Sequence, residues 1–244
     1  MTDARLDVDG VTHRFGGIEA LHDVSLAVEP GSLVAVVGPN GAGKTTLLDV
    51  ISGRLRPSRG AVRWAGADLT RLPPHRVAAL GVGRTFQIAW LFSGLPAIDN
   101  VLIGVTFGAE PARSAKDRRR RAGEILGAVG LDDKAGLPAS RLSLGEQKRL
   151  ELGVALGAGP RLLLLDELGG GLPPRDRDEI QDVCARLRGR GVTVIAIEHG
   201  GEGLVRRADQ VLVLDQGRVV GLGPPEDVLA SRMIAEAYLG EDGV

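Results

Sequence analysis

The sequence predicts an α/β fold in which helices flank a mostly parallel sheet. Short apolar runs of strand length recur along the chain, and helix-forming stretches separate the later ones. The first run leads directly into a glycine-rich loop. Parallel strands need long crossover connections, so this alternation indicates strand–helix–strand units. The four runs span residues 33–37, 162–165, 192–197 and 211–214.

Two other regions differ in character from these units. Residues 6–9 and 24–28 alternate apolar and polar side chains, which predicts an N-terminal β-subdomain. Residues 88–158 are rich in helix formers, and we interpret them as an inserted α-helical subdomain.

Composition limits the classes of function. The chain has 244 residues, which suits one large domain or a domain with an inserted lobe. Its formal net charge of −1 argues against a broad face that binds nucleic acid. No apolar run approaches the ~20 residues needed to cross a bilayer. Work at a membrane would therefore go through partner chains.

A phosphate-binding loop follows the first apolar run. Residues 38–45 match G-x-x-x-x-G-K-[ST] at every fixed position. Glycines let consecutive N–H groups point into one concavity, and the next helix adds its positive N-terminus. We expect Lys44 to reach the β- and γ-phosphates and Thr45 to bind Mg²⁺. The residues expected to contact the nucleotide here are Gly38, Pro39, Asn40, Gly41, Ala42, Gly43, Lys44, Thr45 and Thr46.

Two acidic residues, Asp166 and Glu167, directly follow the apolar run at residues 162–165. Buried acids are costly without a cation or partner. Beside a phosphate loop, Asp166 is placed to hold Mg²⁺ and Glu167 to polarise the attacking water. The alternative is a strand followed by a solvated acidic turn, which the presence of the phosphate loop disfavours.

The segment at residues 142–147, Leu-Ser-Leu-Gly-Glu-Gln, resembles the signature of the ATP-binding cassette (ABC) ATPase family, commonly L-S-G-G-Q. A serine and a glycine at a helix N-terminus form a second phosphate-binding end. The resemblance implies that Ser143, Gly145 and Glu146 contact ATP held by an opposite subunit. An ordinary helix whose Ser143 and Glu146 form a capping box is the alternative, and both can hold.

Three further residues occur in the family's order. Gln87, within Arg-Thr-Phe-Gln at residues 84–87, matches the glutamine that senses Mg²⁺ and water. His199, after the run at residues 192–197, matches the switch histidine that contacts the γ-phosphate. Phe15 matches the aromatic residue that stacks on adenine. The resemblance thus implies catalytic roles for Lys44, Gln87, Glu167 and His199, with Gln87 also at the metal.

Within the family, the chain is most similar to the ATP-binding subunits of branched-chain amino acid importers. Residues 15–21, 84–92 and 236–240 carry this likeness, so one nucleotide-binding domain is expected over residues 1–240, with a short tail at 241–244. The expected cofactors are ATP and Mg²⁺. The implied partners are a second ATPase subunit, identical or not, separate transmembrane permease subunits and, indirectly, a solute-binding protein. The implied location is cytoplasmic, on the inner face of the membrane.

Residues 95–101 resemble the segment that docks a transmembrane partner. Leu91, Phe92, Leu95 and Ile98 could line a groove for a partner helix, or form ordinary core of the helical subdomain.

The chain also departs from the family's pattern. At residues 168–173, Leu-Gly-Gly-Gly-Leu-Pro replaces a loop that usually begins with Pro and carries Asn or Asp at position 173, and Gly200 stands where Asp is common. These changes keep open a degenerate cassette that binds ATP with little hydrolysis. A soluble ABC ATPase of translation or DNA repair is a second alternative. A GTPase switch is disfavoured, because no guanine-reading N-K-x-D motif is present.

Overall fold

The computed structural model describes residues 4–85, 91–108, 114–167, 169–198 and 202–230. Gln87, Leu168, His199 and Gly200 lie outside these ranges, as do the last residues of the predicted domain and its tail. The strands are β1 (Leu6–Phe15), β2 (Ile18–Val28), β3 (Leu33–Val37), β4 (Arg59–Trp64), β5 (Ala67–Asp68), β6 (Val82–Arg84), β7 (Leu162–Asp166), β8 (Thr193–Ile197), β9 (Gln210–Asp215) and β10 (Arg218–Gly223). The helices are α1 (Lys44–Ile51), α2 (Pro74–Ala79), α3 (Ala97–Phe107), α4 (Ala115–Ala128), α5 (Leu144–Gly157), α6 (Pro174–Gly189), α7 (Glu202–Arg207) and α8 (Pro225–Ala230), with short 3₁₀ turns at Asp132–Lys134 and Ala139–Arg141.

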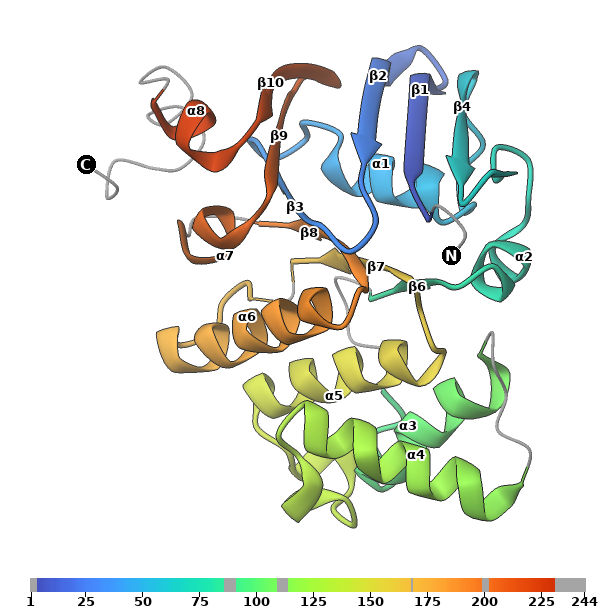
Figure 1. The fold of residues 1–244 in the computed structure, drawn as a ribbon, viewed down its shortest axis with the longest axis vertical. Coiled ribbons are helices and arrows are strands. Elements are labelled where there is room, and N and C mark those ends of the chain that lie inside the picture. Colours follow the sequence, from blue (N-terminus) through green and yellow to red (C-terminus); the bar gives the residue numbers. More distant parts are fainter. Residues whose placement is uncertain (1–3, 86–90, 109–113, 168, 199–201, 231–244) are drawn as a thin grey trace.

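The N-terminal strands form an antiparallel sheet in the order β2-β1-β4-β5. Helix α1 lies beneath this sheet, between it and the second sheet (Figure 1). Leu47, Leu48 and Ile51 of α1 are fully buried in the same apolar cluster as Leu6 and Trp64 of the antiparallel sheet. The predicted N-terminal antiparallel β-subdomain is confirmed, and its packing fixes the helix that follows the phosphate loop.

The central sheet has the order β10-β9-β3-β8-β7-β6. Strands β9 to β6 are parallel, while β10 pairs antiparallel with β9 at one edge. Strand β3 is buried on both faces: Leu33, Ala35 and Val37 join one apolar cluster, and Val34 and Val36 join the other. Both the α/β class and the mostly parallel sheet are as predicted from the apolar runs.

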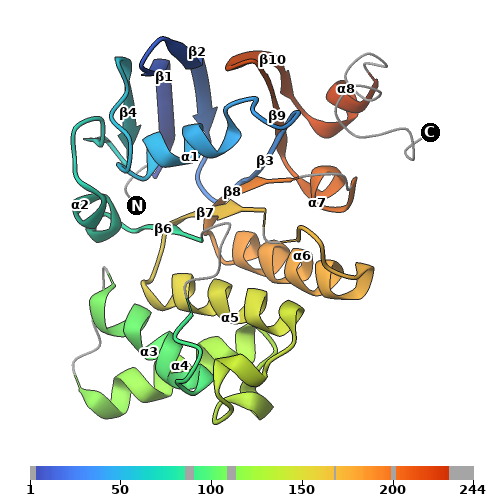
Figure 2. The same cartoon turned by 180° about the vertical axis from the view of Figure 1, so that it is seen from behind.

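Helices α3, α4 and α5 pack together at one end of the molecule, away from the antiparallel sheet (Figures 1 and 2). Their shared core includes Val101, Leu126 and Leu150, all fully buried. Helices α3 and α5 cross closely, because a Cβ on Gly104 would lie 2.2 Å from the carbonyl oxygen of Val154. Helix α5 then leads into β7, so this helical group is attached directly to the strand that ends in the two acids.

Candidate nucleotide-binding site

The phosphate loop leaves the carboxyl end of β3 and enters α1 through three glycines. Gly38, Gly41 and Gly43 have φ values of +147°, +80° and +99°, a region that side chains with a Cβ rarely adopt. Backbone carbonyl groups of two other segments also lie very close to these glycines. A Cβ on Gly38 would lie 2.0 Å from the carbonyl oxygen of Leu214, and one on Gly43 would lie 2.5 Å from that of Ala20. The loop is therefore built around glycine for steric as well as conformational reasons.

This geometry gives a stability prediction. We expect Gly38→Ala to lower the free energy of unfolding by more than about 2 kcal/mol, because it combines backbone strain with a clash. Gly41→Ala is the matched control: Gly41 also has a positive φ, but a Cβ added there would meet nothing within 4 Å. Urea denaturation of both variants measures the difference. Equal losses of stability would contradict the close approach to Leu214.

The side chain of Lys44, the first residue of α1, is hydrogen-bonded to the backbone of the phosphate loop. Its Nζ donates hydrogen bonds to the carbonyl oxygens of Gly38, at 2.6 Å, and Pro39, at 2.9 Å. Only 5% of the residue is exposed. Burial lowers the pKa of the Lys44 amine, and the nearby carboxylates of Glu167 and Asp166 oppose that effect. The ammonium is thus placed at the mouth of the loop, where a phosphate oxygen could replace a carbonyl partner.

A hollow of about 260 Å³ opens over this loop. Its lining residues are Ala20, Asn40, Gly41, Ala42, Gly43, Lys44, Thr45, Thr46 and Glu167. The structure therefore brings most of the predicted loop residues and the second acid of β7 around one space. Ala20, on β2, was missed by the sequence reasoning.

Asp166 and Thr45, the two residues predicted to hold Mg²⁺ along with Gln87, are in contact. The Thr45 hydroxyl donates to Asp166 Oδ1 at 3.4 Å, joining α1 to the end of β7. Asp166 is only 1% exposed, and its backbone N–H donates to the Thr85 hydroxyl at 3.2 Å. Burial raises the pKa of the Asp166 carboxyl, while the Arg84 guanidinium opposes this shift. A carboxylate and a hydroxyl are hard oxygen ligands, so this pair fits Mg²⁺.

Glu167 follows Asp166 with a left-handed backbone, at φ +52°. A glutamate is uncommon in this conformation, and such strain concentrates at functional sites. Glu167 lines the same hollow as Lys44 and lies close enough to influence the pKa of the Lys44 amine. A role in polarising water stays a prediction, to which this position is favourable.

A further acid lies at the same edge of the sheet. Glu198 follows β8, and burial raises its pKa to about 7. Arg177 counteracts this shift, whereas Glu167 adds to it. The carboxyl ends of neighbouring parallel strands β7 and β8 therefore bring acids into mutual influence beside the phosphate loop.

The signature segment caps α5. The Ser143 hydroxyl accepts a hydrogen bond from the Glu146 N–H at 3.3 Å, and the Glu146 carboxylate accepts one from the Ser143 N–H at 2.9 Å. The capping box weighed in the sequence is thus present. Lys134 forms an ion pair with Glu146 and lowers the pKa of that carboxyl. When the signature L-S-G-G-Q is aligned from Leu142, its glutamine corresponds to Glu146 in this chain.

The residues of this helix end, Ser143, Gly145 and Glu146, are not among the described residues that line the hollow over the chain's own phosphate loop. Leu144, between them, is 57% exposed. Ser143 is also exposed, whereas Gly145 is buried and Glu146 is half-buried. Contact of this helix N-terminus with a nucleotide on another subunit stays a prediction.

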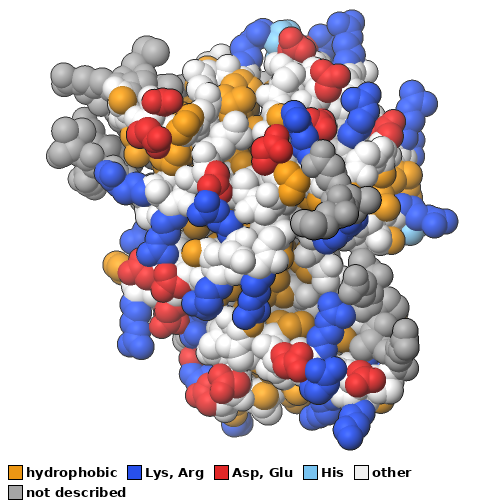
Figure 3. All heavy atoms as spheres, in the orientation of Figure 1, with side chains coloured by type: hydrophobic (Ala, Val, Ile, Leu, Met, Phe, Trp, Pro, Cys, Tyr) orange, Lys and Arg blue, Asp and Glu red, His pale blue; other side chains and the backbone are white. Residues whose placement is uncertain are grey.

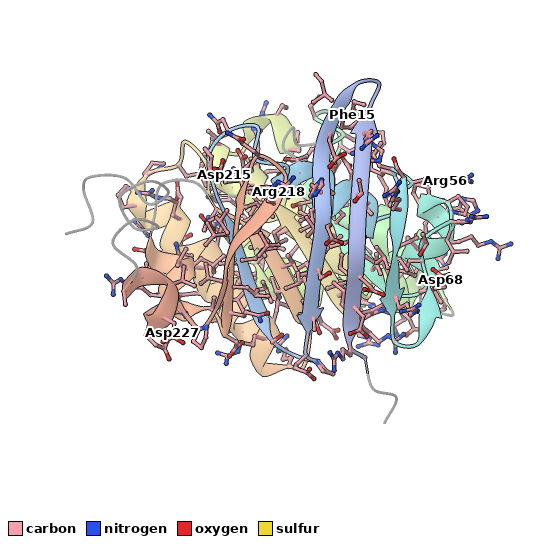
Figure 4. All side chains as sticks on the ribbon, turned by 90° about the horizontal axis from the view of Figure 1, so that it is seen from above. Phe15, Arg56, Asp68, Asp215, Arg218 and Asp227 are labelled. Carbon is pink, nitrogen blue, oxygen red and sulfur yellow. The ribbon has the colours of Figure 1, made fainter. Side chains whose placement is uncertain are left out.

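Phe15 ends β1, beside the turn into β2 (Figure 4). It is 50% exposed and is not among the described residues that line the hollow over the phosphate loop. Its ring meets His13 edge-on, with centroids 4.6 Å apart. Stacking on adenine stays a prediction for Phe15.

The structure adds Arg84, at the end of β6, to the site. Its guanidinium donates to Asp166 Oδ2 at 3.1 Å and to Asp49 Oδ1 at 2.7 Å. No motif indicated this contact. The available signal was a charged residue in the short apolar segment that precedes Gln87.

This fold and site define the class of protein. The model of the ABC transporter family matches residues 21–168, and the chain belongs to that family. The chain is similar to the high-affinity branched-chain amino acid transport ATP-binding protein BraF of Pseudomonas aeruginosa, with 37% identity over 97% of this chain and 98% of BraF.

Solved structures of ATP-binding cassettes share the fold. The ADP conformation of MJ1267, an ATP-binding cassette of an ABC transporter, superposes with a TM-score of 0.86 and 27% identity, covering 97% of this chain and 98% of MJ1267. A dimeric, post-hydrolysis state of the cassette MJ0796, bound to ADP and Pi, gives a TM-score of 0.81 and 27% identity, covering 90% and 98%.

Proposed function

We propose that this chain is the ATP-binding and ATP-hydrolysing subunit of an ABC importer. The observation that carries the proposal is one hollow that the phosphate loop, Lys44 and Glu167 line together, with Thr45 of its lining hydrogen-bonded to Asp166. These are the groups that phosphoryl transfer to water requires: a phosphate cradle, a cation, a metal site and a residue that orients water. The family membership and the role in BraF's name support the same reading.

Mg²⁺ would be held by Thr45 and Asp166, with Gln87 as a third expected contributor. When bound, it neutralises charge on the β- and γ-phosphates. Residues of the chain itself bind the nucleotide and orient the attacking water. The loop N–H groups and Lys44 bind the phosphates, and Glu167 orients water. His199 is proposed to contact the γ-phosphate, and Phe15 to stack on the base.

A second cassette would complete the site. Ser143, Gly145 and Glu146 belong to the N-terminus of α5, where Ser143 is exposed and Gly145 is buried, and none of the three is in the described lining of the hollow of their own chain. The dimeric structure of MJ0796 shows that a related cassette pairs. We propose that ATP is enclosed between the phosphate loop of one subunit and α5 of the other, and that closure moves the permease subunits.

An apolar groove between the central sheet and the helical group is proposed to receive the permease. It holds about 340 Å³. Its lining residues are Ser52, Arg54, Pro74, Ala78, Val82, Gly83, Arg84, Thr85, Leu91, Ile103, Gly104, Phe107, Glu151, Val154, Ala155 and Ala158. Of the four residues suggested from the sequence, Leu91 lines it. Phe92 and Leu95 are exposed, and Ile98 packs on the core.

Phe107 offers a direct test of this groove, since it lines the groove and is 83% exposed. We expect Phe107→Asp to leave ATP hydrolysis by the isolated chain within about twofold, but to lower solute uptake in cells about tenfold or more, as loss of an interface anchor does. Val220→Asp, at an exposed apolar residue of β10, is the matched control. Normal uptake with Phe107→Asp would place the permease contact elsewhere.

The solute is proposed to be a branched-chain amino acid or a related small polar solute, delivered by a binding protein. The chain would act on the cytoplasmic face of the membrane, attached through its partners. Within the described ranges, no helix is long and apolar enough to cross a bilayer. The test is uptake of labelled leucine by cells of the source organism lacking this chain. The proposal expects uptake to fall and wild type, but not Lys44→Ala, to restore it. Unchanged leucine uptake would contradict a branched-chain amino acid as the solute and leave the related small polar solutes to be tested in the same way.

A role with nucleic acid is not supported. Basic and acidic side chains are mixed over the face seen in Figure 3, rather than gathered into one basic region. A nucleic-acid-binding face would show clustered Lys and Arg. This mixture, with the net charge of −1, favours the importer over a soluble ABC ATPase that works on ribosomes or DNA.

A further inference from the structure

We propose that Arg84 is a positioning residue for the metal site: it holds the carboxylate of Asp166 so that one oxygen faces Thr45 and Mg²⁺. The inference rests on the proposed ATPase function. It adds to that function Arg84, a residue to which none of the motifs described above assigned a role.

The two oxygens of Asp166 have separate partners. Oδ2 accepts from Arg84 Nη2 at 3.1 Å, and Oδ1 accepts from the Thr45 hydroxyl at 3.4 Å. The Thr45 hydroxyl and Asp166 Oδ1 are the pair of oxygens that fits Mg²⁺. Arg84 therefore occupies one oxygen of the carboxylate and leaves the other, which contacts Thr45, for the metal.

The guanidinium is itself fixed from the opposite side. Arg84 Nη1 donates to Asp49 Oδ1 at 2.7 Å and to the Ser52 hydroxyl at 2.9 Å. Asp49 belongs to α1 and Ser52 caps its end, so both lie on the helix that begins with Lys44 and Thr45. Arg84 thus ties β7 to the helix that carries the other half of the metal site.

Burial makes the ion pair between Arg84 and Asp166 costly to break. The side chains of Arg84 and Asp166 are only 6% and 2% exposed. A carboxylate removed from water is costly without a cation, and removing one partner of a buried pair leaves the other uncompensated. In the absence of Mg²⁺, Arg84 is the cation that satisfies Asp166. A group that orients a metal ligand in this way usually contributes about 10- to 100-fold to metal affinity.

An opposite role is physically conceivable: Arg84 could compete with Mg²⁺ for Asp166. The geometry favours positioning, because the guanidinium and the Thr45 hydroxyl contact different oxygens of the carboxylate. The two roles predict opposite effects of removing the guanidinium. Positioning predicts weaker Mg²⁺ binding, and competition predicts tighter binding.

The test uses the purified full chain and a fluorescent ATP analogue that cannot be hydrolysed. Its affinity is measured in EDTA and then across a Mg²⁺ titration, with Mn²⁺ electron paramagnetic resonance as a direct report on the metal. The variants are Arg84→Met, which keeps the stem and removes the guanidinium, and Arg84→Lys, which keeps a positive charge. Arg207→Met is the matched control, because it removes a guanidinium from an ion pair, with Asp182, that involves neither Asp166 nor Asp49.

We expect Arg84→Met to need about tenfold more Mg²⁺ for half-maximal binding, with the affinity in EDTA within twofold of wild type. Arg84→Lys should recover most of the loss, and Arg207→Met should stay within about twofold of wild type. An unchanged or lower Mg²⁺ requirement in Arg84→Met would overturn the inference, as would an equal loss of affinity with and without metal. Wild-type chain that binds the analogue but does not hydrolyse ATP would instead refute the proposed function.

Discussion

Lys44→Ala should lower the ATP hydrolysis rate by at least about 100-fold, the usual cost of removing one preorganised donor from developing charge. The Lys44 ammonium is the only lysine amine lining the described part of the hollow, and it already spans the loop carbonyls of Gly38 and Pro39. Its loss removes the cation that would meet the β- and γ-phosphates. Steady-state phosphate release and binding of a fluorescent ATP analogue measure the effect.

The control for this variant is Lys116→Ala, at an exposed position of α4. It removes the same charge from the chain at a distance from the loop, and its hydrolysis rate should equal that of wild type. Wild-type ATP affinity and rate in Lys44→Ala would refute the phosphate-loop assignment.

Glu167→Gln is expected to have the second large effect. A residue that positions or deprotonates water contributes about 10²- to 10⁴-fold to the rate, so kcat should fall in that range. ATP affinity should change little, because the amide keeps the size of the side chain and the loop contacts are untouched. The strained turn at φ +52° is retained in the variant, so a loss of rate reports on the carboxylate rather than on folding.

Single-turnover hydrolysis beside equilibrium nucleotide binding separates these two effects. Glu226→Gln, at an exposed acid in α8, is the control for loss of one negative charge. A Glu167→Gln variant with the kcat of wild type would mean that another group, for which Glu198 at the neighbouring strand end is the first candidate, orients the water.

The sequence anticipated those parts of the site that are local. Residues 38–45 carry their own backbone geometry in their glycines, and the apolar run before Asp166 predicts a buried strand whose end must be polar. The alternation of β3 between two apolar clusters likewise follows from an unbroken apolar run. Such features depend on neighbours in the chain, which a sequence displays directly.

The parts of the site that the sequence did not predict depend on contacts between residues that lie far apart in the chain. Arg84 meets Asp166 across 82 positions and Asp49 across 35, and no spacing rule indicates such a pair. Gly43 needs to be glycine partly because Ala20 of another sheet lies against it. Phe107 becomes part of a groove only when α3 packs beside β6 and α5. These arrangements are set by tertiary packing, so periodicity and motif could not predict them.

The central claim is that two cassettes close on ATP and hydrolyse it. Gel filtration of Glu167→Gln with and without Mg-ATP, beside a hydrolysis assay of wild type, tests it most directly. The account predicts an ATP-dependent shift of the variant from monomer to dimer, together with hydrolysis by wild type. A variant that binds ATP yet stays monomeric, beside a wild type without hydrolysis, would contradict it and favour a degenerate cassette that needs a different partner.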